Sequence, residues 1–276
     1  MRASLFFAAA VLLFVAVAGV QAKVPEDLGA YLAHPEEVAT PETLALWAKV
    51  RKELEARNYS RPTQEQLYEL GYTKDLSASP NAGNYGVDIS SFISPGTFGC
   101  MKNNNYHFAI ARQFMQTCRV DPNGVHTVAN AWAAGLAHVD IYLFPSYGCS
   151  VSAAGQVDAA INGMGNIPFG QLWIDIEVGG QGSAANNYNW MMQALARGTA
   201  RLGNGRMGIY SSRWMWSQVM PGYNGPTQYP MWYANYDGVP SFANFPTFAG
   251  WTRPAMKQFA GDVGLCGANV DLNWYP

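Results

Sequence analysis

Two carboxylic acids, Asp175 and Glu177, lie two residues apart in the apolar segment LWIDIEV at residues 172–178. The segment has the length and composition of a buried β-strand. Successive side chains of a strand point to opposite faces, so we expect both acids on one face. Two carboxylates held together in an apolar interior cannot both ionise freely, so at least one pKa should rise. A carboxylic acid with a raised pKa can act as a general acid, for example at a glycosidic oxygen.

Two features favour catalysis over a pair that only accepts hydrogen bonds or binds an ion. Glu177 is the only glutamate within residues 83–276, and burying a charged group is costly unless the group is paired or functional. Asp88 and Asp271 also lie at the ends of apolar segments, in GVDIS and NVDLN. If the first and last strands are neighbours in a closed barrel, four carboxylates converge on one rim.

Apolar, strand-like segments recur through residues 83–276 and alternate with helical or loop segments. This alternation predicts parallel strands joined by crossover helices, and near-continuous apolar runs are typical of strands buried on both faces. We therefore predict a small α/β barrel that is incomplete because its last strands have little helix between them. An open doubly wound sheet is the alternative, but no GxGxxG or GxxxxGKS/T loop follows a strand. The predicted strands are 85–90, 108–114, 139–145, 171–178, 206–212, 231–237, 256–260 and 270–275, and the predicted helices are 125–137, 151–164, 186–202 and 212–220.

Aromatic residues are frequent in and just after the predicted strands. Such rings can stack on sugar faces while their polar tips bind hydroxyls, although most of them belong to the core in any fold. We expect Tyr142, Tyr210 and Trp232 to lie near the carboxyl ends of their strands. We expect these three to contact a ligand.

Charge divides the chain into two parts. Residues 23–82 contain 17 charged side chains, whereas residues 83–276 contain 18, nine acidic and nine basic. The first part is predicted to be a charged helical leader or propeptide, with a linker-like segment at 77–84 and the only N-glycosylation sequon at Asn58. The second part is long enough for one sizeable core. Its balanced charge shows no basic stripe and argues against a nucleic-acid partner.

Residues 1–22 have the features of a secretory signal peptide. Arg2 is the only charge before Lys23, residues 5–17 are apolar, and small residues precede a cleavage site at Ala22. A membrane anchor is the alternative, but the apolar segment is short for a span of about 20 residues. We expect a secreted protein, or one in a lysosomal or phagosomal lumen, with no membrane span after cleavage.

The chain contains four cysteines. An even number in an oxidising compartment predicts two disulfides, for which three pairings are possible. A zinc site is the alternative, but there is no CxxC or HExxH motif and the four histidines are scattered. We therefore expect no metal and no other cofactor. The cysteines are Cys100, Cys118, Cys149 and Cys266.

A series of short motifs, spread over residues 85–275, resembles glycoside hydrolase family 25, the Chalaropsis-type lysozymes. No single motif is specific, but their ordered set is. The cysteines and the VDPNG turn at 120–124 resemble the eukaryotic branch found in amoebae and nematodes. The motifs are GVDIS at 86–90, WIDIE at 173–177, IYSS at 209–212, WYA at 232–234, QFA at 258–260 and VDLN at 270–273.

The resemblance implies a (β/α)5(β)3 barrel that cuts bacterial peptidoglycan between N-acetylmuramic acid and N-acetylglucosamine. It implies that Glu177 donates the proton and that Asp175 orients the substrate N-acetyl group or stabilises the cationic transition state. Asp88 and Asp271 would complete an acidic groove. Two departures stand out: Arg112 replaces a lysine common after the family's second strand, and Asp237 has no assigned role. We expect a monomer.

Two finer expectations concern mechanism and cross-links. Acids this close on one strand suit attack by the substrate's own N-acetyl carbonyl, with Asp175 in support. Cys118 and Cys149 follow neighbouring predicted strands, which favours their pairing above the barrel. Cys100 and Cys266 would then pair near the edge where the first and last strands meet.

Two other functions compete with the lysozyme prediction. A chitinase-like barrel would carry further aspartates before the acid pair, at positions held here by Gly170 and Trp173. A non-catalytic glycan-binding protein would tolerate loss of the acids, and the presence of all four counts against it.

Overall fold

The strands of the chain close into a barrel, seen in a computed structural model that describes residues 83–179 and 182–276. These residues belong to one compact unit. The predicted signal peptide at 1–22, the leader at 23–82 and the glycosylation site Asn58 lie outside the described residues. Those assignments, and the domain boundary at residue 83, stay predictions.

Eight strands form the barrel wall, and a short ninth, β3 (Arg119–Val120), forms a hairpin with β2. Neighbouring strands run parallel from β1 to β8, and β1 pairs with β2 to close one side. The last strand, β9, runs antiparallel to both β8 and β1, so it closes the ring. The wall consists of β1 (Asn84–Ile89), β2 (Tyr106–Met115), β4 (His138–Leu143), β5 (Leu172–Asp175), β6 (Met207–Ser211), β7 (Met231–Ala234), β8 (Met256–Leu265) and β9 (Ala268–Tyr275).

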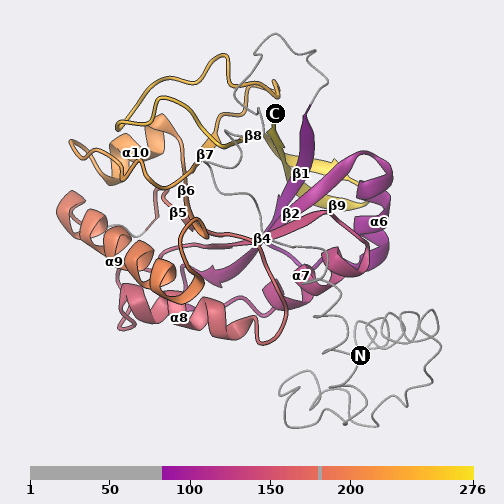
Figure 1. Ribbon diagram of the computed structural model, residues 1–276, viewed down its shortest axis with the longest axis horizontal. Helices are drawn as coiled ribbons and strands as arrows, with labels where there is room; N and C mark the ends of the chain where they lie inside the picture. Colours follow the sequence, from indigo (N-terminus) through magenta and orange to yellow (C-terminus); the bar gives the residue numbers. More distant parts are fainter. Residues whose placement is uncertain (1–82, 180–181) are drawn as a thin grey trace. The chain divides into compact units, whose positions relative to one another are not determined.

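A helix follows each of the first five wall strands, and no helix separates the last three, which confirms the predicted (β/α)5(β)3 order. The helices lie around the outside of the strands (Figure 1). The first helix was not predicted, because its glycine-rich sequence PGTFGCMKN has little helical periodicity. It begins where the Ser94 hydroxyl accepts from the Thr97 amide and Pro95 occupies the first turn. The helices are α6 (Pro95–Asn103), α7 (Gly124–Ala133), α8 (Ala153–Gly163), α9 (Ala184–Leu202) and α10 (Arg213–Val219).

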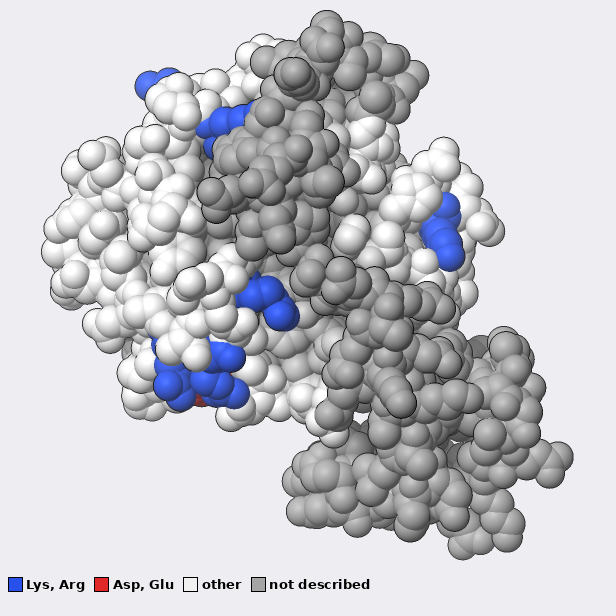
Figure 2. Space-filling model, viewed as in Figure 1, with Lys and Arg blue, Asp and Glu red and all other residues white. Residues whose placement is uncertain are grey.

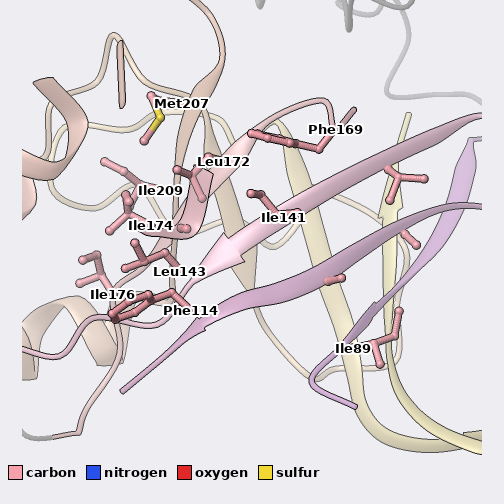
Figure 3. Close-up of a cluster of buried hydrophobic side chains, with 14 of the residues drawn as sticks. Ile89, Phe114, Ile141, Leu143, Phe169, Leu172, Ile174, Ile176, Met207 and Ile209 are labelled. Carbon is pink, nitrogen blue, oxygen red and sulfur yellow. The ribbon is translucent and has the colours of Figure 1, made fainter. Parts of the chain in front are cut away.

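Side-chain alternation along the strands separates two buried layers. On β5, Leu172 and Ile174 point outward and join the main core between the barrel and its helices, as does Ile176 just beyond the strand (Figure 3). Trp173 points inward and packs with the rings and apolar side chains that fill the barrel. This period of two is the one from which the sequence placed Asp175 on the inner face. The inner layer consists of Phe108, Ile110, Tyr142, Trp173, Tyr210, Trp232 and Met256.

Two disulfides join loops to the barrel, and both confirm the predicted pairing. Cys100 of α6 is bonded to Cys266 in the β8–β9 turn, and Cys118 in the β2–β3 turn is bonded to Cys149 after β4. The first bond joins helix α6 to the hairpin that carries Asp271. The second fixes the segment that follows β4 against the end of β2.

Charged side chains are sparse on the described surface. On the face shown in Figure 2, lysine and arginine form small separate groups rather than a stripe. One group lies over α8 and α9, where Arg197 and Arg201 both contact Asp158, at 2.8 and 2.5 Å. Among residues 83–179 and 182–276, no helix is long and apolar enough to cross a membrane.

Candidate active site

A network of carboxyl and amide groups lies at the end of the barrel where the parallel strands finish. Asp88 on β1 is directly opposite Asp271 on β9 in the antiparallel register. The Gln258 side chain on β8 donates from Nε2 to Asp88 Oδ2 at 2.8 Å and to Asp271 Oδ2 at 3.0 Å. Asn273 Nδ2 also donates to Asp88 Oδ2, at 2.6 Å. The closing strands therefore hold two acids together through two amides.

Two aromatic side chains fix the orientation of these amides. The Tyr210 hydroxyl donates to Gln258 Oε1 at 2.6 Å, and Trp232 Nε1 donates to Asn273 Oδ1 at 2.8 Å. Each amide oxygen therefore accepts a hydrogen bond from an aromatic side chain, and each NH2 group donates to a carboxylate. Gln258 and Asn273 were not among the predicted site residues. Asn273 shares the parity of Asp271 on β9, but parity alone does not pair it with Asp88, and Gln258 on β8 has no local signal.

Asp175 is the last residue of β5 and points into the barrel. It is 5 % exposed, lies opposite Tyr210 in the parallel register, and its Oδ1 has no hydrogen-bond partner. Burial raises the pKa of this carboxyl well above its usual range, and the charges of Glu177 and Asp88 raise it further. Arg112 acts in the opposite direction. An unoccupied acceptor on a buried carboxyl is a site for a donor from a ligand.

Glu177 lies two residues beyond the end of β5, although the sequence predicted it within the strand. The chain stays extended there because Ile176 N donates to Tyr210 O at 2.8 Å and Ser211 Oγ donates to Ile176 O at 2.7 Å. Glu177 therefore keeps the inward parity of Asp175 but is only partly buried. Burial raises its pKa to about 7, and the charge of Asp271 adds to this effect.

The pKa values of the remaining two acids are also raised. Burial raises the pKa of Asp88 to about 8, together with the charge of Asp271, while the amides of Asn273 and Gln258 oppose the shift. Burial likewise raises the pKa of Asp271. Electrostatic coupling links all four acids, so they form one group, which we call the four-carboxyl group (Asp88, Asp175, Glu177 and Asp271). The predicted convergence of these acids is present.

An open groove of about 730 Å³ lies beside this group. Glu177 and Tyr210 line it at the barrel end, and the start of α10 and the segment after β7 form its walls. Glu177 is thus the member of the four-carboxyl group that faces the groove. The lining residues are Glu177, Tyr210, Ser212, Arg213, Trp214, Met215, Ser217, Tyr233, Ala234, Asn235 and Tyr236.

The three predicted ligand-binding aromatics occupy different depths. Tyr210 lines the groove. Tyr142 is buried in the barrel, where burial and the charges of Asp88 and Asp175 raise its pKa. Trp232 is the second residue of β7, so the prediction that it lies late in its strand is wrong. It is 2 % exposed and bonded to Asn273. We therefore assign Trp232 a supporting role, in which it orients the Asn273 amide, and no contact with the sugar.

Two residues that the sequence left without a role have clear contacts. Arg112 lies within β2, where its Nε contacts Asp121 Oδ2 at 2.7 Å and its guanidinium donates to Ser90 O at 2.9 Å. Asp237 follows β7 and accepts from the buried Lys257 Nζ with both oxygens, each at 2.8 Å. This ion pair anchors the segment that carries the groove residues Asn235 and Tyr236. Among the described residues, no cluster of three or more histidine, cysteine or acidic side chains suits a metal ion.

The chain is similar to several lysozymes and lysozyme-like proteins. A sequence profile described as lysozyme-like protein 1 matches residues 79–259. A probable GH family 25 lysozyme of Dictyostelium discoideum is 40% identical over 193 residues, covering 69% of this chain and 90% of that protein. Lysozyme-like protein 5 of Caenorhabditis elegans is 34% identical over 202 residues, covering 71% and 93%. A family GH25 lysozyme from Aspergillus fumigatus shares the fold, with a TM-score of 0.58, 16% identity and coverage of 71% and 94%.

Proposed function

Because the chain belongs to the family 25 glycoside hydrolases, we propose that it is a lysozyme of the N-acetylmuramidase type. Its reaction is hydrolysis of the β-1,4 bond between N-acetylmuramic acid and N-acetylglucosamine in bacterial peptidoglycan. The observation that carries the proposal is the pair at the end of β5. Glu177 faces an open groove with a raised pKa, and beside it Asp175 is buried with one unoccupied oxygen.

Glu177 is the proton donor in this proposal. Its pKa of about 7 keeps much of the side chain protonated at mildly acidic pH, so it can protonate the leaving oxygen as the glycosidic bond breaks. Tyr210 and Ser211 fix the backbone that carries it. A proton donor held by a rigid segment keeps its alignment with the scissile bond.

Asp175 acts on the substrate's acetamido group. The acetamido N–H donates to the unoccupied Asp175 Oδ1, which turns the carbonyl oxygen toward the anomeric carbon. That oxygen forms a bond to the anomeric carbon as the glycosidic bond breaks, and Glu177 protonates the departing oxygen. Water then attacks the anomeric carbon, opens the oxazoline ring and returns its proton to Glu177, so configuration is retained.

Asp88 and Asp271 complete the acidic end of the groove. The pKa of Asp88, raised to about 8, favours its protonated form, which limits the negative charge beside Glu177. The pKa of Asp271 is shifted in the same direction. Gln258 donates to both, so the pair is held without a cation. We assign these acids to shaping the field around Glu177 and Asp175.

The anomer first released tests the mechanism. Proton NMR of a fresh digest should show the β-anomer of the new reducing sugar, because attack by the acetamido oxygen followed by water inverts the centre twice. Initial release of the α-anomer would rule out this mechanism.

A turbidity assay on killed bacteria separates the lysozyme proposal from its rivals. Wild-type protein should clear cell walls, and Glu177→Gln should not. Equal and poor clearing by both proteins would favour a non-catalytic glycan-binding protein. Clearing of chitin but not of cell walls would favour a chitinase. The acids that a chitinase would need at positions 170 and 173 are a glycine and a fully buried tryptophan.

We place the protein outside the cell or in a lysosomal or phagosomal lumen, as a monomer after loss of residues 1–22. The signal-like N-terminus supports this location, and the two disulfides are typical of oxidising compartments. N-terminal sequencing of the protein isolated from its source and its fractionation within the cell test the assignment.

A further inference from the structure

The groove contains two side chains, at the start of α10, that hydrolysis of the bond does not use. Arg213 and Trp214 begin α10, both are exposed, and both line the groove. Trp214 is 58 % exposed. An exposed indole beside a catalytic acid costs little to bury against a sugar ring and offers it a flat apolar face.

The backbone fixes these two side chains relative to Glu177. Ser211 ends β6 and donates to Ile176 O at 2.7 Å, one residue before Glu177. Ser212 caps α10, with its hydroxyl accepting from Met215 N at 3.0 Å. Ser211 and Ser212, the two residues before Arg213, are therefore both held by hydrogen bonds, and one of these bonds joins them to the segment that carries Glu177. A ligand that fills the groove would therefore contact both Glu177 and the start of α10.

One lining side chain, Arg213, carries the charge that an anionic ligand requires. Arg213 is the only basic side chain and Glu177 the only acidic one among the residues that line the groove. The ion pairs of the described residues do not include Arg213. Burial and the charge of Asp237 raise the pKa of the groove residue Tyr233, and the charge of Arg213 opposes this rise, so Arg213 acts within the groove. A guanidinium in this position can bind a carboxylate with two parallel hydrogen bonds.

The segment after β7 presents a second aromatic ring to the groove. Tyr236 is 59 % exposed and lines the groove from the segment after β7. Its ring edge packs closely against Gly261, where an added Cβ would lie 2.9 Å from Cε2. Trp214 from α10 and Tyr236 from the segment after β7 thus line one groove with Glu177, which suits a polymer that passes between the two rings.

We propose that Arg213 and Trp214 form a subsite for a carboxylate-bearing muramyl residue. Trp214 stacks on a sugar ring, and Arg213 pairs with a carboxylate on the lactyl arm, whether the free lactyl acid or an acid of the attached peptide. The inference rests on the proposed lysozyme function and adds the feature by which the groove selects peptidoglycan over uncharged chitin. Specificity arises because only the charged polymer satisfies Arg213.

Calorimetric binding in a Glu177→Gln background tests the subsite without turnover. The ligands are a peptide-free tetrasaccharide of alternating N-acetylglucosamine and N-acetylmuramic acid, the same tetrasaccharide with its peptides, and chitotetraose. Arg213→Gln should weaken binding of a carboxylate-bearing ligand by about fivefold, and less at high salt. It should leave chitotetraose unchanged, and Arg213→Lys should lose less affinity. A loss confined to the peptide-free ligand assigns the contact to the free lactyl carboxylate, which becomes an uncharged amide when a peptide is attached. A loss confined to the peptide-bearing ligand assigns it to an acid of the peptide, and a loss for both shows that Arg213 binds a carboxylate from either source.

Two controls complete the experiment. Trp214→Ala should weaken all three ligands by about tenfold, because stacking does not depend on the carboxylate. Arg119→Gln removes an exposed arginine on β3, outside the groove, and should change nothing. If Arg213→Gln behaves like Arg119→Gln, or weakens chitotetraose equally, the subsite is overturned while cell-wall cleavage by the wild type still stands. Absence of cleavage by the wild type would instead overturn the lysozyme function.

Discussion

Asp88 and Asp271 lie directly opposite each other on β1 and β9, and a single NH2 group, Gln258 Nε2, donates to both. The two acids are far apart in sequence and come together because the last strand runs antiparallel to the first. One amide thus separates two carboxyls that would otherwise repel each other when ionised. We expect the pKa values of Asp88 and Asp271 to depend on this shared hydrogen-bond donor.

Replacement of Gln258 by leucine should lower kcat about tenfold and alter the pH–rate profile. Without the shared donor, the pKa values of Asp88 and Asp271 rise further, and the Tyr210 hydroxyl loses its acceptor. Steady-state kinetics from pH 3 to pH 9 would measure both effects. Gln193→Leu, an exposed position on α9, is the matched control. A lower rate with an unchanged profile would show that Gln258 only supports the fold.

Activity should fall as the pH rises through about 7. Glu177 must be protonated to act as an acid, and its pKa is raised to about 7. Above that value the active fraction decreases about tenfold for each further pH unit. Initial rates on solubilised peptidoglycan, measured as a function of pH, would show this decrease. A rate that is constant from pH 6 to pH 9 would contradict the assignment of Glu177 as the general acid.

Stability must be measured over the same pH range as a control. The folded pKa of Asp88 is about 8, against 3.8 for the free side chain. The folded protein therefore keeps a proton that the unfolded chain has released, so stability falls between about pH 4 and pH 8. Rates count only where the Tm lies well above the assay temperature.

Removal of Asp237 should lower the free energy of unfolding by about 3 kcal/mol, because it leaves the buried Lys257 ammonium without its carboxylate. Lys257 is 1 % exposed. Urea denaturation of Asp237→Ala would give the value. Asp158→Ala breaks the surface contacts with Arg197 and Arg201 and should cost less than about 1 kcal/mol. Equal losses of unfolding free energy in the two variants would show that the buried ion pair stabilises the fold no more than the surface one.

The two disulfides should contribute unequally. They span 166 and 31 residues of sequence, and loop-closure entropy predicts losses of up to about 5 and about 4 kcal/mol when each is removed. Paired serine variants, Cys100→Ser with Cys266→Ser and Cys118→Ser with Cys149→Ser, compared by urea denaturation, would test the order. A larger loss from the shorter loop would show that native-state contacts outweigh chain entropy here.

Alternation of side chains made much of the site predictable. Parity placed Asp175 and Glu177 on one face, the positions of Asp88 and Asp271 at the ends of apolar segments predicted a shared rim, and the order of strands and helices indicated the barrel. The pattern of side chains was less informative about where a strand ends. β7 ends at Ala234, three residues earlier than its apolar run suggested, and Trp232, its second residue, is buried in the barrel instead of contacting the groove.

The amides of the network were beyond prediction for a different reason. Gln258 and Asn273 are ordinary polar residues until they meet Asp88, from which they are separated by 170 and 185 residues. Such contacts depend on which strands close the barrel and in which direction. Asp237 and Lys257 likewise have no local signature. Their roles follow from tertiary pairing, which residue spacing does not encode.

Mass spectrometry of a peptidoglycan digest is the most direct test of the central claim. Purified cell walls are treated with wild-type protein or with Glu177→Gln, and the reducing ends of the released fragments are identified after borohydride reduction. We predict muramitol ends from the wild type and a loss of at least about 100-fold in their release by Glu177→Gln. Glucosaminitol ends, no fragments from the folded wild type, or equal release by both proteins would contradict the account.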